Sequence, residues 1–384
     1  MNKIGCFAPY GHYHLDIHGF VKPCCYWHAD VGHKRKLYEF DNLESIGKEL
    51  TDYMSDDIMD LGCVKCVQYE AKNVPSLRQK LNRNITWEDK RHLPKDLEVS
   101  LDSICNFACV MCDKSRSSKW RSLGKNIKNL PKDKNISDEN HFDTVERLLI
   151  NSDLTELIEV KMLGGEPFYS KNFPTFIDIL DDKTDITKVV LTITTNSSVF
   201  PTDKLLKKLL RFKRLQVNSS IDGVGDTAEV VRYGTKWKDV EKNLLAWRDL
   251  VINDKEKVAL AISPTFHIFN MEHEKRLRVW WLQNFRNVFN ATGSIAYTLA
   301  TEPYLCIQNL NKKFRRQFDP PVYDVKRWKT KPKFFSTWNQ YSEVPYEIIY
   351  NYIENYSNMV GIDMAETIPL TMEQLRRQQS AIIS

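Results

Sequence analysis

The stretch Cys105-Asn106-Phe107-Ala108-Cys109-Val110-Met111-Cys112 places three cysteines at spacings of four and three residues, directly after the strand-like run Leu97-Glu98-Val99-Ser100-Leu101. Thiolates held this closely in one loop converge on one point, which suits a soft metal better than a disulfide. A tetrahedral zinc site needs a fourth Cys or His ligand, and none follows before His141. Three thiolates with one open position instead suit an iron–sulfur cluster that leaves one iron free for a substrate.

The composition is that of an ordinary globular protein. The chain has 384 residues, 42% hydrophobic and 27% charged, enough for a large domain plus a smaller one. A net charge of +5 is too small to indicate a nucleic-acid partner by itself. No stretch approaches the roughly 18 apolar residues of a transmembrane helix, and the start lacks the apolar core of a signal peptide. Nine clustered cysteines indicate metal ligands in a reducing compartment, so we expect a cytoplasmic protein with no membrane partner.

The first ninety residues carry a second set of cysteines. Alternating residues before and after Gly19 predict a β-hairpin that brings Cys6 and Cys24 close together. A helix is expected next, with Asp41 as its N-cap and Glu44 completing a capping box, followed by the CxxC pair Cys63 and Cys66. Together they make a four-thiolate site for structural zinc or a closed iron–sulfur cluster.

Two neighbours of this set are ambiguous. Cys25 is either a spare thiol or the ligand in place of Cys24. His12, His14 and His18 are read as a plain polar strand face. Residues 76–92 are expected to form a basic helical linker into the next unit.

From about Leu97 onward strands alternate with helices, which is typical of parallel β/α architecture. The pattern predicts strands at 97–102, 158–163, 189–195, 215–222, 258–265 and 294–299. It predicts helices at 138–151, 202–212, 238–253 and 272–289, with Thr202 as the N-cap of the second.

The two faces of these strands differ in polarity. One face carries apolar residues such as Val160 and Met162 and should pack against the helices. The other carries Glu98, Lys161 and Asn218 among further polar residues. Because the interior of a barrel is normally bulky and apolar, a polar inner face predicts a cavity that holds a polar ligand.

The CX3CX2C loop after the first predicted strand resembles that of the radical S-adenosylmethionine (SAM) superfamily. The resemblance implies a partial (β/α)6 barrel and a 4Fe–4S cluster whose open iron chelates the amino and carboxylate groups of SAM. Further motifs fall in the family order at the ends of strands. Gly164, Gly165 and Glu166 resemble the GGE motif that holds the SAM amino group.

Three more positions extend the resemblance, which covers roughly residues 1–300. Ser220 and Asp222 resemble the ribose-binding motif, and Arg232 is placed like the family arginine that pairs with the cofactor carboxylate. Asn196 has a weaker family parallel and is expected at the border of the same pocket.

The N-terminal cysteines resemble the twitch or SPASM extension of these enzymes, which carries an auxiliary 4Fe–4S cluster. Here the module precedes the barrel instead of following it, and a single cysteine pair follows the hairpin, as in the half-size twitch form. The expected domains are an auxiliary module at 1–92, a partial barrel at 93–300 and a C-terminal extension at 301–384. The expected ligands of two clusters are Cys105, Cys109 and Cys112, and Cys6, Cys24, Cys63 and Cys66.

Two charged residues are candidates for catalysis. Lys161 lies three residues before Gly164, and Asp102 lies three residues before Cys105, so both should point into the barrel beneath the cofactor. Buried charges need a partner. That partner is either a charged substrate or the other residue of the pair, in an ion pair that props adjacent strands.

The C-terminal extension gives a weaker signal. Residues 312–333 are rich in Lys and Arg with interleaved aromatic residues, which suits nucleic acid or an acidic peptide but is also typical of a solvated linker. Residues 343–359 and 371–383 predict closing helices, and Cys306 is expected to be a buried thiol.

The family resemblance implies an enzyme that reductively cleaves SAM to a 5′-deoxyadenosyl radical and abstracts hydrogen from a peptide, a protein or a small polar metabolite. It also implies an electron donor such as flavodoxin or ferredoxin. An RNA-modifying radical enzyme and a non-catalytic iron–sulfur or zinc protein that binds nucleic acid are the alternatives.

Overall fold

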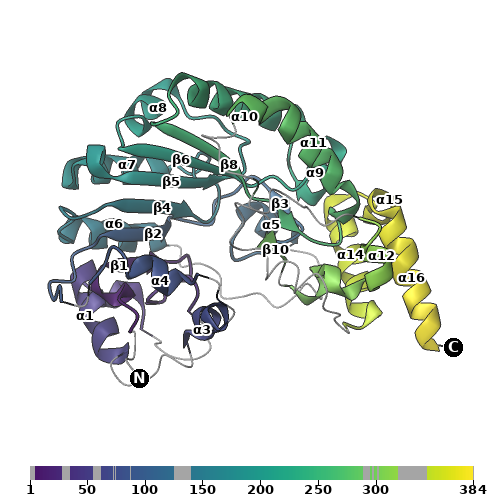
Figure 1. Cartoon of the computed structure of the whole chain (residues 1–384), viewed down its shortest axis with the longest axis horizontal. Helices are drawn as coiled ribbons and strands as arrows, with labels where there is room; N and C mark the ends of the chain where they lie inside the picture. Colours follow the sequence, from purple (N-terminus) through teal and green to yellow (C-terminus); the bar gives the residue numbers. More distant parts are fainter. Residues whose placement is uncertain are drawn as a thin grey trace.

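The centre of the computed structural model is a six-stranded sheet in which every pair of neighbouring strands is parallel, in the order β1-β2-β4-β5-β6-β8 (Figure 1). The strands are His12–Leu15 (β1), Asp96–Ser100 (β2), Glu159–Leu163 (β4), Val190–Thr195 (β5), Arg214–Ser219 (β6) and Val258–Ile262 (β8). The structure describes residues 5–27, 35–54, 62–71, 73, 75–86, 88–124, 140–288, 295, 298–300, 302–318 and 344–383. The parallel α/β fold and its partial barrel are as the sequence predicts.

The described α-helices follow the chain from one end to the other. They are Leu43–Met54 (α1), Val64–Glu70 (α3), Leu77–Leu81 (α4), Ser118–Leu123 (α5), His141–Asn151 (α6), Asn172–Lys183 (α7), Asp203–Leu209 (α8), Asp226–Val231 (α9), Trp237–Asn253 (α10), Glu274–Phe285 (α11), Lys312–Arg315 (α12), Tyr346–Val360 (α14), Met364–Thr367 (α15) and Pro369–Ile383 (α16). Two-residue strands form two further pairs, Ala108–Cys109 (β3) with Arg232–Tyr233 (β7) and Thr265–Phe266 (β9) with Thr298–Leu299 (β10). Short 3-10 helices lie at Ala8–Tyr10, Leu37–Glu39, Ile186–Lys188, Met271–His273, Arg286–Val288, Pro303–Leu305 and Ile307–Asn309.

The outer face of the sheet carries apolar side chains, and the inner face carries polar ones. Outer-face residues such as Val160, Leu191 and Val217 are fully buried in one core with apolar residues of α6, α7, α8 and α10, which lie along the outside of the sheet in Figure 1. Inner-face residues such as Lys161 and Asn218 are only half-buried. The contrast follows from the period of two along each strand. It leaves the polar face available to solvent and ligands.

Five of the six predicted barrel strands are present, but the sixth strand of the sheet is a different segment. β1 pairs in parallel with β2, with His14 opposite Glu98. The predicted hairpin around Gly19 is therefore wrong, although Gly19 does make a turn with φ +64°. Of the segment 294–299, residues 298–299 form β10, which pairs with β9 outside the main sheet, and most of the rest lies outside the described residues.

The histidines of β1 are not a plain polar strand face. His12 and His14 are buried, and their Nδ1 atoms lie 2.8 Å from a carboxylate oxygen of Asp96 and 3.1 Å from one of Glu98. Tyr13, between them, faces the apolar core. Both faces of this strand are thus covered, which explains why it adds to the sheet edge.

Local boundaries near the N-terminal cysteines also differ from the predictions. The side chain of Asn42, not that of Asp41, accepts from the backbone N–H of Ser45 at 2.9 Å and begins α1. The predicted linker helix at 76–92 shortens to α4, which Ser76 caps with Gln79 in a reciprocal capping box. The α4 residue Lys80 lies 3.2 Å from Glu159 of β4, so α4 contacts the N-terminal ends of the strands.

Other helices begin and end close to their predicted positions. α6, α8, α10 and α11 match the four predicted barrel helices within a few residues. Thr202 caps α8 by accepting from Leu205 N–H at 3.4 Å. The closing helices are α14 and α16, which lie at the other end of the molecule from α1 in Figure 1.

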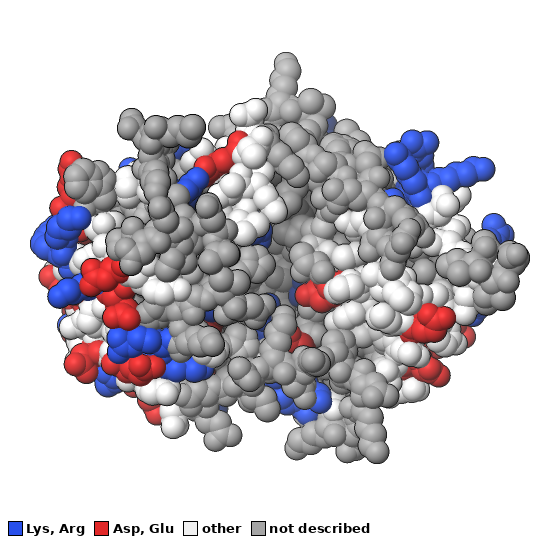
Figure 2. All heavy atoms as spheres, turned by 90° about the horizontal axis from the view of Figure 1, so that it is seen from below, with Lys and Arg blue, Asp and Glu red and all other residues white. Residues whose placement is uncertain are grey.

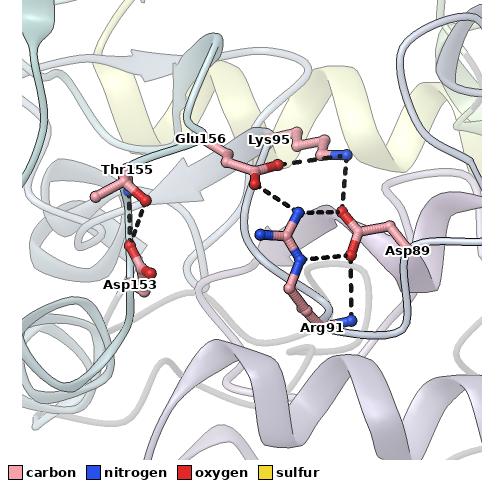
Figure 3. A network of polar contacts seen from close by, with 6 residues as sticks. All are labelled: Asp89, Arg91, Lys95, Asp153, Thr155 and Glu156. Carbon is pink, nitrogen blue, oxygen red and sulfur yellow. Dashed lines mark hydrogen bonds and ion pairs between the residues drawn. The ribbon is translucent and has the colours of Figure 1, made fainter.

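A charged network ties the segment before β2 to the loop before β4 (Figure 3). Arg91 contacts Asp89 at 3.1 Å and Glu156 at 2.6 Å, and Lys95 contacts Asp89 at 3.0 Å. Because Arg91 is largely exposed, water screens its pairs with Asp89 and Glu156, which add little stability.

Among the described residues, no helix is both long enough and apolar enough to cross a bilayer. Figure 2 shows acidic and basic side chains lying next to one another on the left of the view. Charges of both signs are thus interspersed there.

Candidate active site

The loop that follows β2 carries the three predicted cluster cysteines, and the fold holds it tightly. Its β3 segment pairs antiparallel with β7, so that Cys109 lies opposite Arg232. The N–H of Val110 donates to Val231 O at 2.9 Å. The cysteine loop is thus joined by backbone hydrogen bonds to the segment that carries the predicted cofactor arginine.

Four successive carbonyl oxygens of this loop accept hydrogen bonds from side chains of other segments. Ser117 donates to Phe107 O at 2.6 Å, Tyr356 to Ala108 O at 2.6 Å, Trp120 to Cys109 O at 2.8 Å and Tyr352 to Val110 O. All four donors are buried. Because these bonds give buried carbonyl oxygens a partner, they help to fix the shape of the loop.

The three thiols are free and in weak contact with polar neighbours. Cys109 Sγ accepts from Arg232 at 3.6 Å, Cys105 Sγ from Asn196 Nδ2 at 4.0 Å, and Cys112 Sγ lies 3.8 Å from Asp113 O. Burial raises the pKa of Cys105 to about 12, with the Cys109 thiol adding to the rise. Burial likewise raises the pKa of Cys112, and both other thiols contribute.

These thiols influence one another but do not form a closed set. Among the described residues, no group of three or more His, Cys, Asp or Glu side chains is close enough to hold a metal ion as it stands. The assignment of Cys105, Cys109 and Cys112 as cluster ligands stays a prediction. Their chemistry fits it, because a cationic iron core would relieve the mutual repulsion of three buried thiolates.

The predicted Gly-Gly-Glu turn packs directly against the cysteine loop. Gly164 and Gly165 have φ of +71° and +52°. A Cβ at Gly164 would lie 2.7 Å from the side chain of Ser100, and one at Gly165 would lie 2.6 Å from Ile104 O. The next N–H, that of Glu166, donates to Ile104 O at 2.8 Å. Only glycine allows this approach and this backbone conformation.

Glu166 is a buried carboxylate in need of positive charge. It accepts from Thr195 Oγ1 at 2.7 Å and from the N–H groups of Asn196 and Phe168 at 2.6 and 3.2 Å. Burial raises its pKa to about 7, although these hydrogen bonds oppose the rise. Within the described part of the chain Glu166 forms no ion pair. A ligand ammonium would supply the missing cation.

Asn196 and Ser220 lie beside the same turn. Asn196 Nδ2 donates to Asn106 Oδ1 at 3.0 Å, inside the cysteine loop. The Ser220 N–H donates to Thr195 O at 2.8 Å, and its side chain is half-buried. Both predicted pocket residues therefore lie next to Glu166 or the cysteine loop.

Asp222 and Arg232 form a buried ion pair with each other. Arg232 Nε lies 2.7 Å from Asp222 Oδ2, and the two side chains are 11% and 0% exposed. Asp222 also accepts from the Thr265 N–H at 2.7 Å. The residues predicted to bind the ribose and the carboxylate of SAM thus lie together, with Arg232 also touching Cys109.

The proposed ion pair between Lys161 and Asp102 is not formed. Lys161 Nζ lies 2.5 Å from Glu98 Oε1, the residue directly opposite it in the register of β2 and β4. Asp102 instead accepts from Ser170, from Asn172 Nδ2 at 2.9 Å and from the Ile104 N–H at 2.9 Å. Asp102 fixes the turns around the cysteine loop, so the prediction of this pair is wrong.

The four N-terminal cysteines lie near one another. The thiols of Cys63 and Cys66 contribute to the raised pKa of Cys6, and those of Cys6 and Cys66 to the raised pKa of Cys24, in each case after burial as the main cause. Cys25 behaves differently, because its thiol hydrogen-bonds with Glu98. Cys24 thus lies with the other three thiols and Cys25 does not. The metal assignment itself stays a prediction.

Several site residues escaped the sequence reasoning. Tyr352 and Tyr356 lie about 240 positions from the loop that they contact, and no local signal announces such a contact. His267 is fully buried near Arg232, which lowers its pKa together with burial to about 3. Its Nδ1 accepts from the Phe269 N–H at 3.1 Å.

The basic and aromatic segment 312–333 is described only as far as residue 318. There Phe314 and Arg315 of α12 are buried, so these two side chains face the protein rather than a partner. The remainder lies outside the described residues. Cys306 is half-buried, with its thiol 3.3 Å from Ala300 O.

Comparisons with known proteins gave one family match and several similar solved structures. Residues 99–277 match the Radical SAM superfamily. Among solved structures, native anSMEcpe with bound AdoMet is 15% identical over 69% of this chain and 62% of that chain, with a TM-score of 0.36. Streptococcus suis SuiB bound to S-adenosylmethionine is 16% identical over 70% of this chain and 57% of that chain, with a TM-score of 0.35. The chain spans less than two thirds of the length of either. The comparison with curated proteins gave no match.

The matched range begins in β2 and ends in α11. It therefore contains the cysteine loop, the Gly-Gly-Glu turn and the pair of Asp222 and Arg232. Residues 99–277 are thus a domain that matches the Radical SAM superfamily.

Proposed function

We propose that the chain holds a 4Fe–4S cluster through Cys105, Cys109 and Cys112 and cleaves SAM reductively beside it. The observation that carries this proposal is the buried Glu166 carboxylate, which forms no ion pair among the described residues, is acted on by the Arg232 charge only at longer range, and lies against the cysteine loop. When bound, such a cluster supplies the electron that splits SAM into methionine and a 5′-deoxyadenosyl radical, which abstracts hydrogen from the substrate.

The chain's own residues bind and orient SAM. Glu166 accepts hydrogen bonds from its ammonium group, and Gly164 and Gly165 let the backbone approach it. Arg232 grips the carboxylate with its planar fork, while Ser220 and Asp222 bind the ribose, and Asn196 borders the pocket. Since Asp222 and Arg232 are paired in the free protein, SAM replaces part of that pairing when it binds.

An auxiliary 4Fe–4S cluster is proposed at Cys6, Cys24, Cys63 and Cys66. It is supported by the raised pKa of Cys6, to which the Cys63 and Cys66 thiols contribute after burial, and by that of Cys24, to which the Cys6 and Cys66 thiols contribute after burial. The contact of Cys25 with Glu98 favours Cys24 as the ligand. We assign this module to residues 1–92, the barrel to 93–300 and the extension to 301–384. β1 joins the module to the barrel sheet.

The substrate class is proposed from the family resemblance alone. It is a peptide or protein, or a small polar metabolite, with an electron donor such as flavodoxin or ferredoxin and a cytoplasmic location. The polar, half-buried inner face of the sheet suits such substrates.

The test is anaerobic reconstitution with iron and sulfide, reduction with dithionite and mass spectrometry for 5′-deoxyadenosine. We expect release from the wild-type chain and none from Cys109→Ala. The matched control is Cys306→Ala, which removes a thiol outside both sets and should leave release unchanged. A reconstituted chain that binds iron but releases no 5′-deoxyadenosine would contradict the proposal.

A further inference from the structure

The inner face of the sheet carries a row of directly opposed side chains that no predicted cofactor contact uses. The register places His14, Glu98, Lys161, Thr192 and Gln216 opposite one another on successive strands from β1 to β6. The row lies two residues below the ends of β2 and β4, whereas the cysteine loop and the Gly-Gly-Glu turn follow those ends. It is therefore deeper in the barrel than the SAM pocket.

Two neighbouring members of this row, Glu98 and Lys161, are exposed very differently. The Glu98 side chain is only 3% exposed and lies between His14, at 3.1 Å, and Lys161, at 2.5 Å. The Lys161 side chain is 37% exposed, although β4 is an inner strand of the sheet. A ligand on this face therefore meets the ammonium group and not the carboxylate.

The strand residues that neighbour Lys161 on the side of β5 and β6 carry no charge. On the next strands the half-buried residues are Thr194, Gln216 and Asn218, which are uncharged. On the side of β2, the exposed residue Cys25 approaches, with Lys161 and Lys65 both near its thiol. Lysine has three donors, and Glu98 occupies one of them.

We infer that Lys161 is the anchor for a carboxylate group of the substrate, with Glu98 and His14 holding the lysine in place. This inference rests on the proposed function and names the chemical class of its substrate. An ammonium held at a fixed position by a buried carboxylate is pre-organised, so little side-chain freedom is lost when the anion binds. The amide side chains of Gln216 and Asn218 supply further donors along the face.

Cys25 provides a reporter that is not itself one of the proposed cluster ligands. The rate of alkylation of Cys25 in the full chain is measured with anionic iodoacetate and with neutral iodoacetamide, and the labelled site is located by peptide mass spectrometry. The ratio of the two rates cancels the reactivity of the thiol itself. We expect Lys161→Met to lower this ratio by about threefold, as loss of one nearby charge predicts. Lys161→Arg should preserve the ratio.

The matched control is Lys80→Met. It removes a lysine that pairs with Glu159, the first residue of β4, two positions before Lys161. It should leave the ratio unchanged. Glutarate should protect Cys25 from iodoacetamide at millimolar concentration, and neutral glutaramide should not. Stronger protection by a glutamate-containing pentapeptide than by glutarate assigns the site to acidic peptides, and the reverse order assigns it to a small acid.

An unchanged ratio in Lys161→Met, or equal protection by glutarate and glutaramide, overturns the inference. If Cys25 resists both reagents, the titration is read from the ¹³C-methyl signal of reductively methylated Lys161, where no shift with glutarate overturns it equally. These measurements need no SAM cleavage. A chain that fails to release 5′-deoxyadenosine but binds glutarate at Lys161 would refute the proposed function and not this inference.

Discussion

At the scale of single residues, the site contains two buried charged side chains of opposite sign, and only one of them has an ion-pair partner among the described residues. Arg232 is compensated by Asp222 at 2.7 Å, and Glu166 has hydrogen-bond donors but no ion-pair partner among the described residues. A zwitterion such as the amino-acid end of SAM matches both, because its ammonium serves Glu166 and its carboxylate serves Arg232.

The first prediction concerns Arg232→Lys. A lysine cannot reproduce the bidentate fork, so SAM affinity should fall by roughly ten- to a hundredfold, about 1.5–3 kcal/mol. Iron content should not change, because Arg232 is not a cluster ligand. Titration calorimetry of the reconstituted protein measures the affinity. The control is Arg211→Lys, an arginine in an exposed pair with Asp181. Unaltered affinity in Arg232→Lys would remove this residue from the SAM site.

The second prediction concerns pH and Glu166. Because burial raises its pKa from 4.5 to about 7, the carboxyl group must lose a proton before it can accept an ammonium. SAM affinity should therefore fall about tenfold per pH unit below pH 7 and level off above it. Without SAM, the stability of the fold changes with pH in the opposite direction. The raised carboxyl pKa contributes stability that is fully present below about pH 4.5 and is lost as the pH rises through 7. Affinity that is constant from pH 5.5 to 8 would show that Glu166 does not bind the ammonium.

At the scale of elements, strand positions were predictable and strand partners were not. Alternation of apolar and polar residues gave β4, β5, β6 and β8 close to their bounds. The same alternation in β1 suggested a local hairpin, because a sequence pattern does not say which strand will pair with it. The buried Tyr13 and His14 find their partners in the core and in β2, more than 80 residues away.

The partner of Lys161 shows where the reasoning about the site stopped. Glu98 and Asp102 both lie on the inner face by the alternation of the strand. The sequence reasoning selects Asp102 as the partner of Lys161 because Asp102 precedes the cysteine loop. Only the register of β2 and β4, which places Glu98 directly opposite Lys161, decides between them. The motif residues lie near one another because each follows the end of a parallel strand. The carboxyl ends of neighbouring parallel strands meet at one edge of the sheet.

The third prediction concerns α14, the helix that supports the cysteine loop. Tyr356→Phe removes the donor to Ala108 O and leaves a buried carbonyl oxygen unsatisfied, which should cost about 1–3 kcal/mol of unfolding free energy. Denaturant unfolding of the free chain measures this. Tyr350→Phe, on the exposed side of the same helix, is the control and should cost little. Equal stability of both variants would show that α14 does not hold the loop.

At the scale of the whole molecule, the segments before and after the barrel both contact it. The barrel supplies the thiols and Glu166, the C-terminal helix α14 supplies two tyrosines, and the N-terminal segment adds β1 and the approach of Cys25 to Glu98. α14 packs on the barrel through buried residues. Truncation of the extension should therefore disturb the loop of Cys105, Cys109 and Cys112 before it disturbs the four N-terminal cysteines.

The last prediction is the iron content of the whole chain, purified without oxygen. Two 4Fe–4S clusters need close to eight irons per chain. Replacing Cys105, Cys109 and Cys112 by alanine should leave about half of this iron and abolish SAM cleavage, because the N-terminal thiols are a separate set. Replacing Cys24 should remove the other half, whereas Cys25→Ala should remove none, since its thiol contacts Glu98 instead. Iron is measured by plasma mass spectrometry together with zinc. Tightly bound zinc in the triple variant would refute the auxiliary iron–sulfur cluster while leaving the first cluster in place.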